Sequence, residues 1–87
     1  MASIEIYTKF TCPYCVRAKQ HFASHNLAYT EHDLGVAGSK ELLQARLPEG
    51  YTLRQVPQIF IDDAHIGGYM DMTEWFLART KLKEGVV

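Results

Sequence analysis

The two cysteines of this chain are the residues best suited to do chemistry. They are Cys12 and Cys15, within Thr11-Cys12-Pro13-Tyr14-Cys15, and the 87-residue sequence contains no others. Three uses of such a pair compete: a structural disulfide, half of a metal site, or a dithiol that is oxidised and regenerated. The rest of the sequence has to decide between them.

Composition and charge argue against the structural disulfide and against several classes of function. The hydrophobic fraction of 47% and charged fraction of 22% are typical of a globular protein, and we expect residues 1–87 to form a single domain. A net charge of −1, with scattered Lys and Arg, argues against nucleic acid as a partner. No apolar run is long enough to span a membrane, so no membrane partner is expected. The chain starts with Met1 and lacks the pattern of a signal peptide. We therefore expect a cytoplasmic protein, where a lone disulfide staple would not persist.

The metal alternative requires two histidines as further ligands. Cys12, Cys15, His21 and His25 read C-x2-C-x5-H-x3-H, whereas finger-type zinc sites leave about twelve residues for the chain to turn back. Only five residues separate Cys15 from His21, and all of them are predicted to be helical. At 100° per residue, His21 is rotated about 240° from Cys15 and faces away from it. We therefore expect no metal site.

Hydrophobic periodicity predicts the elements that must position the cysteines. Strands are predicted over 3–8, 27–34 and 56–62, with a short fourth strand at His65-Ile66. Helices are predicted from Pro13 to about His25, from an N-cap at Ser39 to Pro48, and after Gly67-Gly68. Leu42, Leu43 and Leu47 form the expected apolar face of the second helix. The order βαβαββα indicates an α/β protein in which helices cover one small sheet.

At the start of the first helix, the C-x-x-C spacing favours redox chemistry. Residues i and i+3 lie on one side of a helix, at a separation that a disulfide can span. Cys12 would lie at the helix N-terminus, where unpaired backbone N–H groups favour the thiolate, and Cys15 would be more sheltered. Lys9 precedes Cys12 by three residues. It either adds positive charge beside the thiolate or is an ordinary solvated lysine.

The whole chain resembles a dithiol glutaredoxin, a member of the thioredoxin-like fold. The matching signatures are Lys9–Cys15, Val56–Ile61, His65–Gly68 and Asp71, in that order. The resemblance implies a four-stranded mixed sheet flanked by three helices. It also implies a monomer that reduces protein disulfides and glutathione mixed disulfides, with glutathione as reducing co-substrate and without a tightly bound cofactor.

The resemblance also implies a role for each residue of the site. Cys12 would attack the disulfide, and Cys15 would resolve the mixed disulfide. Lys9 would hold a carboxylate of glutathione, and Tyr14 would pack beside the tripeptide. The remaining contacts would come from the backbone of Val56, a cis Pro57, the turn at Gly68, the backbone N–H groups of Tyr69 and Met70, and Asp71, which would face the γ-glutamyl amino group or cap the last helix.

Two positions depart from the pattern of the family. Gln55 stands in place of the usual threonine, and Met70 in place of a polar residue. Together with Arg54, they leave open a glutaredoxin-like electron donor, for example to ribonucleotide reductase, that thioredoxin reductase rearms instead of glutathione. A third alternative is a non-enzymatic carrier of a metal or cluster. Pro13 and Cys15 count against that class, which usually has a small residue after its single cysteine.

Overall fold

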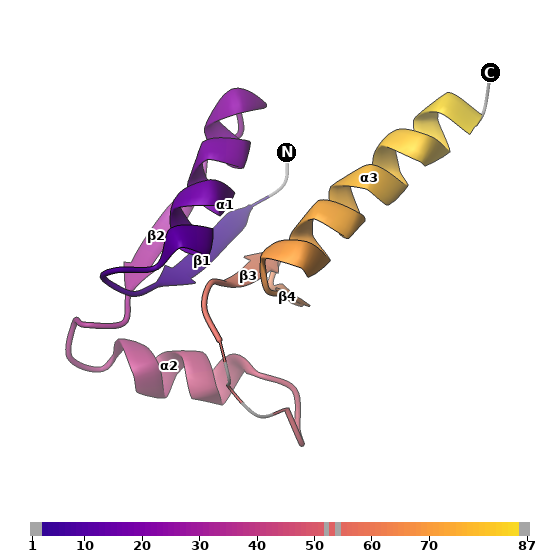
Figure 1. The fold of residues 1–87 in the computed structure, drawn as a ribbon. Coiled ribbons are helices and arrows are strands. Elements are labelled where there is room, and N and C mark those ends of the chain that lie inside the picture. Colours follow the sequence, from indigo (N-terminus) through magenta and orange to yellow (C-terminus); the bar gives the residue numbers. More distant parts are fainter. Residues whose placement is uncertain (1–2, 52, 54, 86–87) are drawn as a thin grey trace.

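The computed structural model describes residues 3–51, 53 and 55–85, and residues 79–85 as backbone only. The elements are β1 (Ile4–Thr8), α1 (Pro13–Ser24), β2 (Thr30–Asp33), α2 (Ser39–Arg46), β3 (Gln58–Ile61), β4 (Ala64–Gly67) and α3 (Tyr69–Gly85) (Figure 1). The predicted order of strands and helices is confirmed. Arg54 lies outside the described residues.

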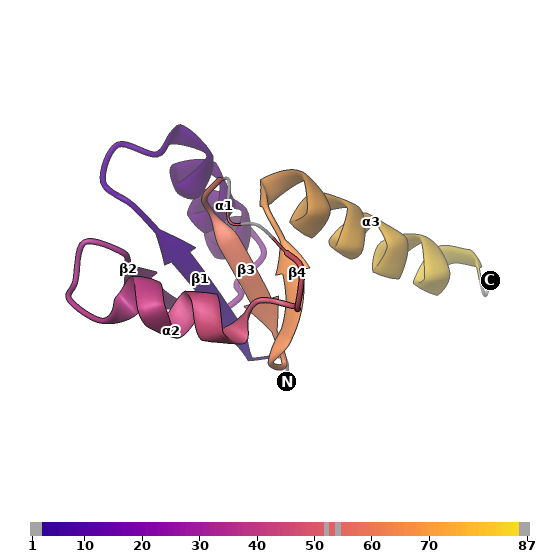
Figure 2. The ribbon, with the colours of Figure 1, turned by 90° about the horizontal axis from the view of Figure 1, so that it is seen from below.

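The four strands form one mixed sheet in the order β2-β1-β3-β4. β1 and β2 are parallel, whereas β1–β3 and β3–β4 are antiparallel. A parallel pair needs a crossover connection, and α1 provides it. Helices α1 and α3 lie on one face of the sheet and α2 lies on the other (Figure 2). The expected sheet flanked by three helices is therefore confirmed.

The alternation of side chains along the central strands divides the core into two clusters. The larger cluster faces α1 and α3, and its buried members are Ile4, Ile6, Ala18, Phe22, Ile59, Ile61 and Met72. The smaller cluster faces α2 and contains Tyr7, Leu43 and Phe60. Because β1 and β3 are covered on both faces, the sheet is a rigid platform for the loops at its end.

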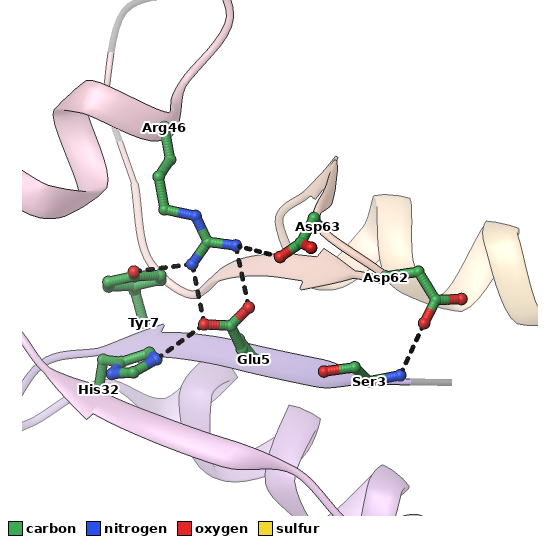
Figure 3. Close-up of polar contacts among 7 residues, drawn as sticks. All are labelled: Ser3, Glu5, Tyr7, His32, Arg46, Asp62 and Asp63. Atoms are coloured by element: carbon green, nitrogen blue, oxygen red, sulfur yellow. Dashed lines mark hydrogen bonds and ion pairs between the residues drawn. The ribbon is translucent and has the colours of Figure 1, made fainter. Parts of the chain in front are cut away.

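A polar cluster holds the end of α2 against the sheet (Figure 3). Both terminal nitrogens of Arg46 donate to the carboxylate of Glu5 at 2.9 Å, and Nη1 also donates to the Tyr7 hydroxyl at 2.9 Å. The guanidinium lies 4.0 Å from the centre of the Phe60 ring. Arg46, as a hydrogen-bond donor, lowers the pKa of Glu5, and His32, 3.1 Å from Glu5 Oε1, acts in the same direction. This bidentate pairing fixes α2 to β1.

Two predictions about α2 are wrong. The N-cap is Gly38, whose φ of 88° is left-handed, and Ser39 is the first helical residue. Glycine adopts this φ without a steric penalty, so the chain turns one residue earlier than predicted. Leu42 is 64% exposed, whereas Leu43 is fully buried. Successive helical residues point about 100° apart, so this short helix turns one of the two leucines towards the sheet.

Candidate active site

The two cysteines lie at the N-terminus of α1, where the sequence places them. Cys12 is the N-cap, with extended backbone, and Pro13 occupies the first turn. The two cysteines form a disulfide, with their Cα atoms 5.2 Å apart. The backbone N–H of Cys15 donates to Cys12 Sγ at 3.1 Å. The helix end thus offers a hydrogen bond and positive potential to the Cys12 sulfur, which favours a thiolate once the disulfide is reduced.

The two sulfurs differ in their access to solvent. Cys15 is 2% exposed, whereas Cys12 is partly exposed. Cys12 Sγ lies 3.7 Å from the carbonyl oxygen of Val56. An incoming disulfide can therefore reach Cys12 along the backbone of Val56, while Cys15 is reached through Cys12.

A hollow of about 230 Å³ lies beside this backbone. The Val56–Pro57 peptide bond is cis, as the resemblance implies. The lining residues come from three separate segments and are Tyr14, Gln55, Val56, Pro57, Tyr69 and Met70. The rings of Tyr14 and Tyr69 lie 5.6 Å apart, between α1 and α3. Five of the predicted site residues thus line a single hollow.

The turn from β4 into α3 forms one end of this region. The N–H of Gly68 donates to Asp71 Oδ2 at 3.0 Å, so Asp71 caps its own helix. The N–H of Met72 donates to the Gly68 carbonyl at 3.0 Å and makes the first intrahelical bond. The N–H groups of Tyr69 and Met70 precede that bond and belong to the first turn, whose donors suit an anion.

Glycine is required on the strand side of this turn. Gly67 has a φ of 120°, and a Cβ at this position would lie 2.5 Å from Asp71 Oδ2. A side chain would therefore strain the backbone and collide with the cap of α3. The chain can approach the start of α3 this closely because the position is glycine.

Lys9 and Gln55 complete the surroundings of Val56. Exposed Lys9 lines a further hollow of about 390 Å³ together with Gln55 and Val56. Gln55, a departure from the family pattern, places its Nε2 2.8 Å from the point that a Gly68 Cβ would occupy. A polar donor therefore lies over the turn before α3. The place of Gln55 directly before Val56-Pro57 is the sequence feature that could have indicated that its side chain lies beside the site.

The loop that leads into α1 contains Phe10, which belongs to the matching motif but to which sequence reasoning gave no role. Phe10 is 88% exposed and precedes Cys12 by two residues. Thr11 has a φ of 59°, which is unusual for a β-branched residue. An aromatic residue in a short loop before a reactive cysteine is the sequence feature that could have indicated an exposed apolar side chain near Cys12.

Over the described residues, no three His, Cys, Asp or Glu side chains converge to hold a metal ion. Within the same part of the chain, no helix is both long and apolar enough to cross a membrane. His21 contacts the rings of His25 and Phe76, which agrees with the helical rotation expected for it.

Comparisons with known proteins agree with this geometry. The family model for glutaredoxin matches residues 4–66. The chain is 48% identical to glutaredoxin 3 of Escherichia coli strain K12 over 73 residues, or 83% of each chain. It superposes on the crystal structure of glutaredoxin 1 from Francisella tularensis complexed with cacodylate with a TM-score of 0.73 and 33% identity, covering 95% of this chain and 99% of that one. The buckwheat glutaredoxin–glutathione complex gives a TM-score of 0.69 and 30% identity, covering 84% and 66%. This chain belongs to the glutaredoxin family, and its Cys12–Cys15 pair makes it a dithiol thiol-disulfide oxidoreductase with the thioredoxin-like fold.

Proposed function

We propose that this protein uses glutathione to reduce protein disulfides and glutathione mixed disulfides, acting as a monomeric, single-domain enzyme of the cytoplasm. The observation that carries the proposal is the position of the Cys12 sulfur. It lies at the N-terminus of α1, 3.7 Å from the Val56 carbonyl, beside the hollow of Tyr14, Pro57 and Tyr69. A related protein, buckwheat glutaredoxin, forms a complex with glutathione.

The reaction begins at Cys12. The Cys12 thiolate attacks one sulfur of the substrate disulfide, a Cys12–S bond forms, and the other sulfur leaves as a thiolate that takes up a proton. With a protein disulfide, Cys15 then loses its proton and attacks Cys12, which releases the second substrate thiol and forms the Cys12–Cys15 disulfide. The substrate gains two electrons and the dithiol loses them. Two molecules of glutathione return the dithiol and leave as glutathione disulfide.

Glutathione has three separate points of attachment in the proposed pose. Its cysteinyl backbone pairs with the backbone of Val56 in the manner of an added strand. Its γ-glutamyl carboxylate accepts hydrogen bonds from the N–H groups of Tyr69 and Met70 at the start of α3, near Gly68 and Asp71. Lys9 attracts the second carboxylate, and Tyr14 packs beside the tripeptide.

The two departures from the family pattern weaken this pose little. Replacing a polar side chain by Met70 removes at most one hydrogen bond, about 1 kcal/mol or roughly fivefold in affinity. The backbone donors of Tyr69 and Met70 do not depend on the side chains. The position of Gln55 Nε2 over Gly68 supports the pose, because it leaves an amide donor at the end where the carboxylate would bind.

A second candidate function is an electron donor, for example to ribonucleotide reductase, that thioredoxin reductase rearms. The observation that favours it is the exposure of Met70, which is 66% and makes the rim of the hollow less polar. The two functions differ in the reductant that acts on the Cys12–Cys15 disulfide.

A coupled assay separates the two functions. The oxidised protein is supplied with a glutathione mixed disulfide and with either glutathione, glutathione reductase and NADPH, or thioredoxin reductase and NADPH. We expect NADPH oxidation with the glutathione system and little with thioredoxin reductase. Turnover with thioredoxin reductase alone would replace the first proposal by the second.

A further inference from the structure

We propose that the protein has a second substrate subsite, which receives an apolar side chain next to the cysteine of a polypeptide disulfide. The subsite is the surface formed by Phe10, Val16 and Val36, on a side of Cys12 that the proposed glutathione hollow does not include. The inference rests on the proposed attack by Cys12, and it adds the class of protein substrate.

Two adjoining hollows define this surface. The first has a volume of about 490 Å³ and is lined by Cys12, Pro13, Val16 and Phe10 among others. The second, of about 550 Å³, is lined by Phe10, Leu34, Gly35 and Val36 among others. Phe10 therefore stands between the two. None of the residues that line the hollow of Tyr14, Val56, Pro57 and Tyr69 lines either one.

The apolar side chains that line these two hollows are open to solvent. The exposed fractions are 88% for Phe10, 60% for Val36 and 49% for Val16. Covering such side chains with an apolar partner removes apolar surface from water, which is favourable. Single exposed apolar residues are ordinary, but Phe10 and Val16 line the hollow that includes the reactive cysteine, and Val36 lines the adjoining hollow that shares Phe10.

The charges around the first hollow favour a neutral occupant. Its rim carries Lys9 and Lys19 against Glu31 and Asp33, so the formal charges cancel. Lys19 Nζ lies 3.0 Å from Glu31 Oε2, and the buried Thr8 hydroxyl donates to the same oxygen at 2.7 Å. A charged side chain would gain little from this balanced rim, whereas an apolar side chain would cover Phe10.

A polypeptide is the occupant because it extends in both directions from its cysteine. When that cysteine is bonded to Cys12, one direction follows Val56 and the hollow beside Pro57. The other direction leads over Pro13 and Val16 towards Phe10. Glutathione, a tripeptide already assigned to the first direction, would meet this surface only at Lys9, which also lines both hollows, and it leaves Phe10 open. The Val56 side of Cys12 thus binds glutathione, and the Phe10 side binds the apolar residue next to a polypeptide cysteine.

Single-turnover reduction of two peptide disulfides tests the subsite. The reduced protein is mixed, without glutathione, with the symmetric disulfide of a capped Leu-Cys-Leu peptide or of a capped Ser-Cys-Ser peptide. Formation of the Cys12–Cys15 disulfide is followed by rapid acid quench and mass spectrometry. The Leu peptide should react about tenfold faster than the Ser peptide, and Phe10→Ser should reduce this ratio to within about twofold of one.

Leu42→Ser is the matched control, because Leu42 is similarly exposed on α2 and should leave the ratio as in the wild type. Equal rates for both peptides in the wild type would overturn the subsite while leaving the proposed function intact. Absence of reaction with either peptide would overturn the attack by Cys12 itself. Sedimentation showing that wild-type protein dimerises, and Phe10→Ser does not, would also overturn the proposal, since a second copy would then cover Phe10.

Discussion

At the scale of single residues, the two cysteines differ in their surroundings. Cys12 is accessible and accepts a hydrogen bond from the helix end, whereas Cys15 is buried. Cys12→Ser should therefore abolish activity on every disulfide. Cys15→Ser should retain removal of glutathione from a mixed disulfide and lose at least tenfold in reduction of a protein disulfide. The two rates can be measured with a glutathionylated protein and with an intramolecular protein disulfide. Equal losses in both variants on the glutathionylated substrate would contradict the assignment.

Lys9 supplies a second prediction at this scale. Its exposed side chain lines the hollow beside Val56, so it would attract the ligand before and after the chemical step alike. Lys9→Ala should raise the KM for glutathione about threefold to tenfold and change kcat less. Lys9→Arg should restore most of the affinity, because it keeps the charge. A fall in kcat with unchanged KM would instead show that Lys9 stabilises only the transition state and does not hold glutathione in the ground state.

At the scale of elements, the anchoring of α2 is the contact most open to measurement. Arg46→Met keeps an apolar stem over Phe60 but removes the hydrogen bonds to Glu5 and Tyr7. We expect a loss of about 1–2 kcal/mol in the free energy of unfolding, measured in urea at neutral pH. Arg17→Met, which removes a guanidinium from over the exposed Tyr14 ring, should have a smaller effect.

The Arg46–Glu5 pair also predicts how the free energy of unfolding depends on pH. The pKa of Glu5 is lowered in the folded state from its ordinary 4.5, chiefly by its hydrogen bonds from Arg46. In the unfolded chain, the Glu5 carboxylate therefore binds a proton more readily than it does in the folded protein. The contribution of this pair is present above about pH 4.5 and is lost as the pH falls through the folded pKa. Urea unfolding of Arg46→Met should show a shallower loss of stability over that range than the wild type. Identical slopes would show that Arg46 does not stabilise the Glu5 carboxylate.

His21 lies where α1 packs against α3, and it predicts a second pH range, above that of Glu5, over which the free energy of unfolding changes. Its Nε2 is buried without a hydrogen-bond partner among the described residues, and burial, with His25 nearby, lowers its pKa below 6.5. The stability that depends on neutral His21 is thus complete above about pH 6.5 and is lost as the pH falls towards the folded pKa. His21→Gln should flatten the stability profile between pH 7 and 5. Some slope should remain, because burial also lowers the pKa of His65.

The elements show what the sequence could and could not predict. Alternation predicted β1 and helical periodicity predicted the helices, because burial on one face leaves a repeating pattern. The third strand, which is buried on both faces, was predicted from its β-branched and aromatic residues, and the fourth from the turn before it. The starts of β2 and β3 lie two to three residues later than predicted. At β3, Pro57 has no N–H to give to a ladder, so pairing begins at Gln58. The contact of Arg46 with Glu5 joins residues 41 positions apart, and no local pattern predicts such a pairing.

At the scale of the whole molecule, the order of the motifs predicted a set of site residues, five of which line one hollow. The fold then brings Tyr14, Val56 and Tyr69 to one hollow, although they come from three segments. The exposure of Phe10 and the position of Gln55 over Gly68 depend on loop conformation and side-chain direction. Neither leaves a periodic signal in the sequence, so the structure was needed to find them.

The whole chain is also expected to unfold as one domain. The two clusters of the core share the same sheet, since β1 and β3 contribute to both. They should therefore lose their packing together. We expect thermal unfolding followed by circular dichroism and by fluorescence of Trp75 to give coincident transitions. Separate midpoints would indicate that α3, which carries Trp75, unfolds independently of the sheet.

The most direct test of the central claim is to locate glutathione on the protein. In ¹⁵N-labelled Cys15→Ser, Cys12 can be joined by a disulfide to glutathione or, as the control, to 2-mercaptoethanol. The glutathione adduct should shift the amide signals of Val56, Tyr69 and Met70 relative to the control, because these backbone groups contact the tripeptide. Spectra that differ only around Phe10 and Val36, or that do not differ at all, would contradict the assignment of the groove between Cys12, Pro57 and α3 to glutathione.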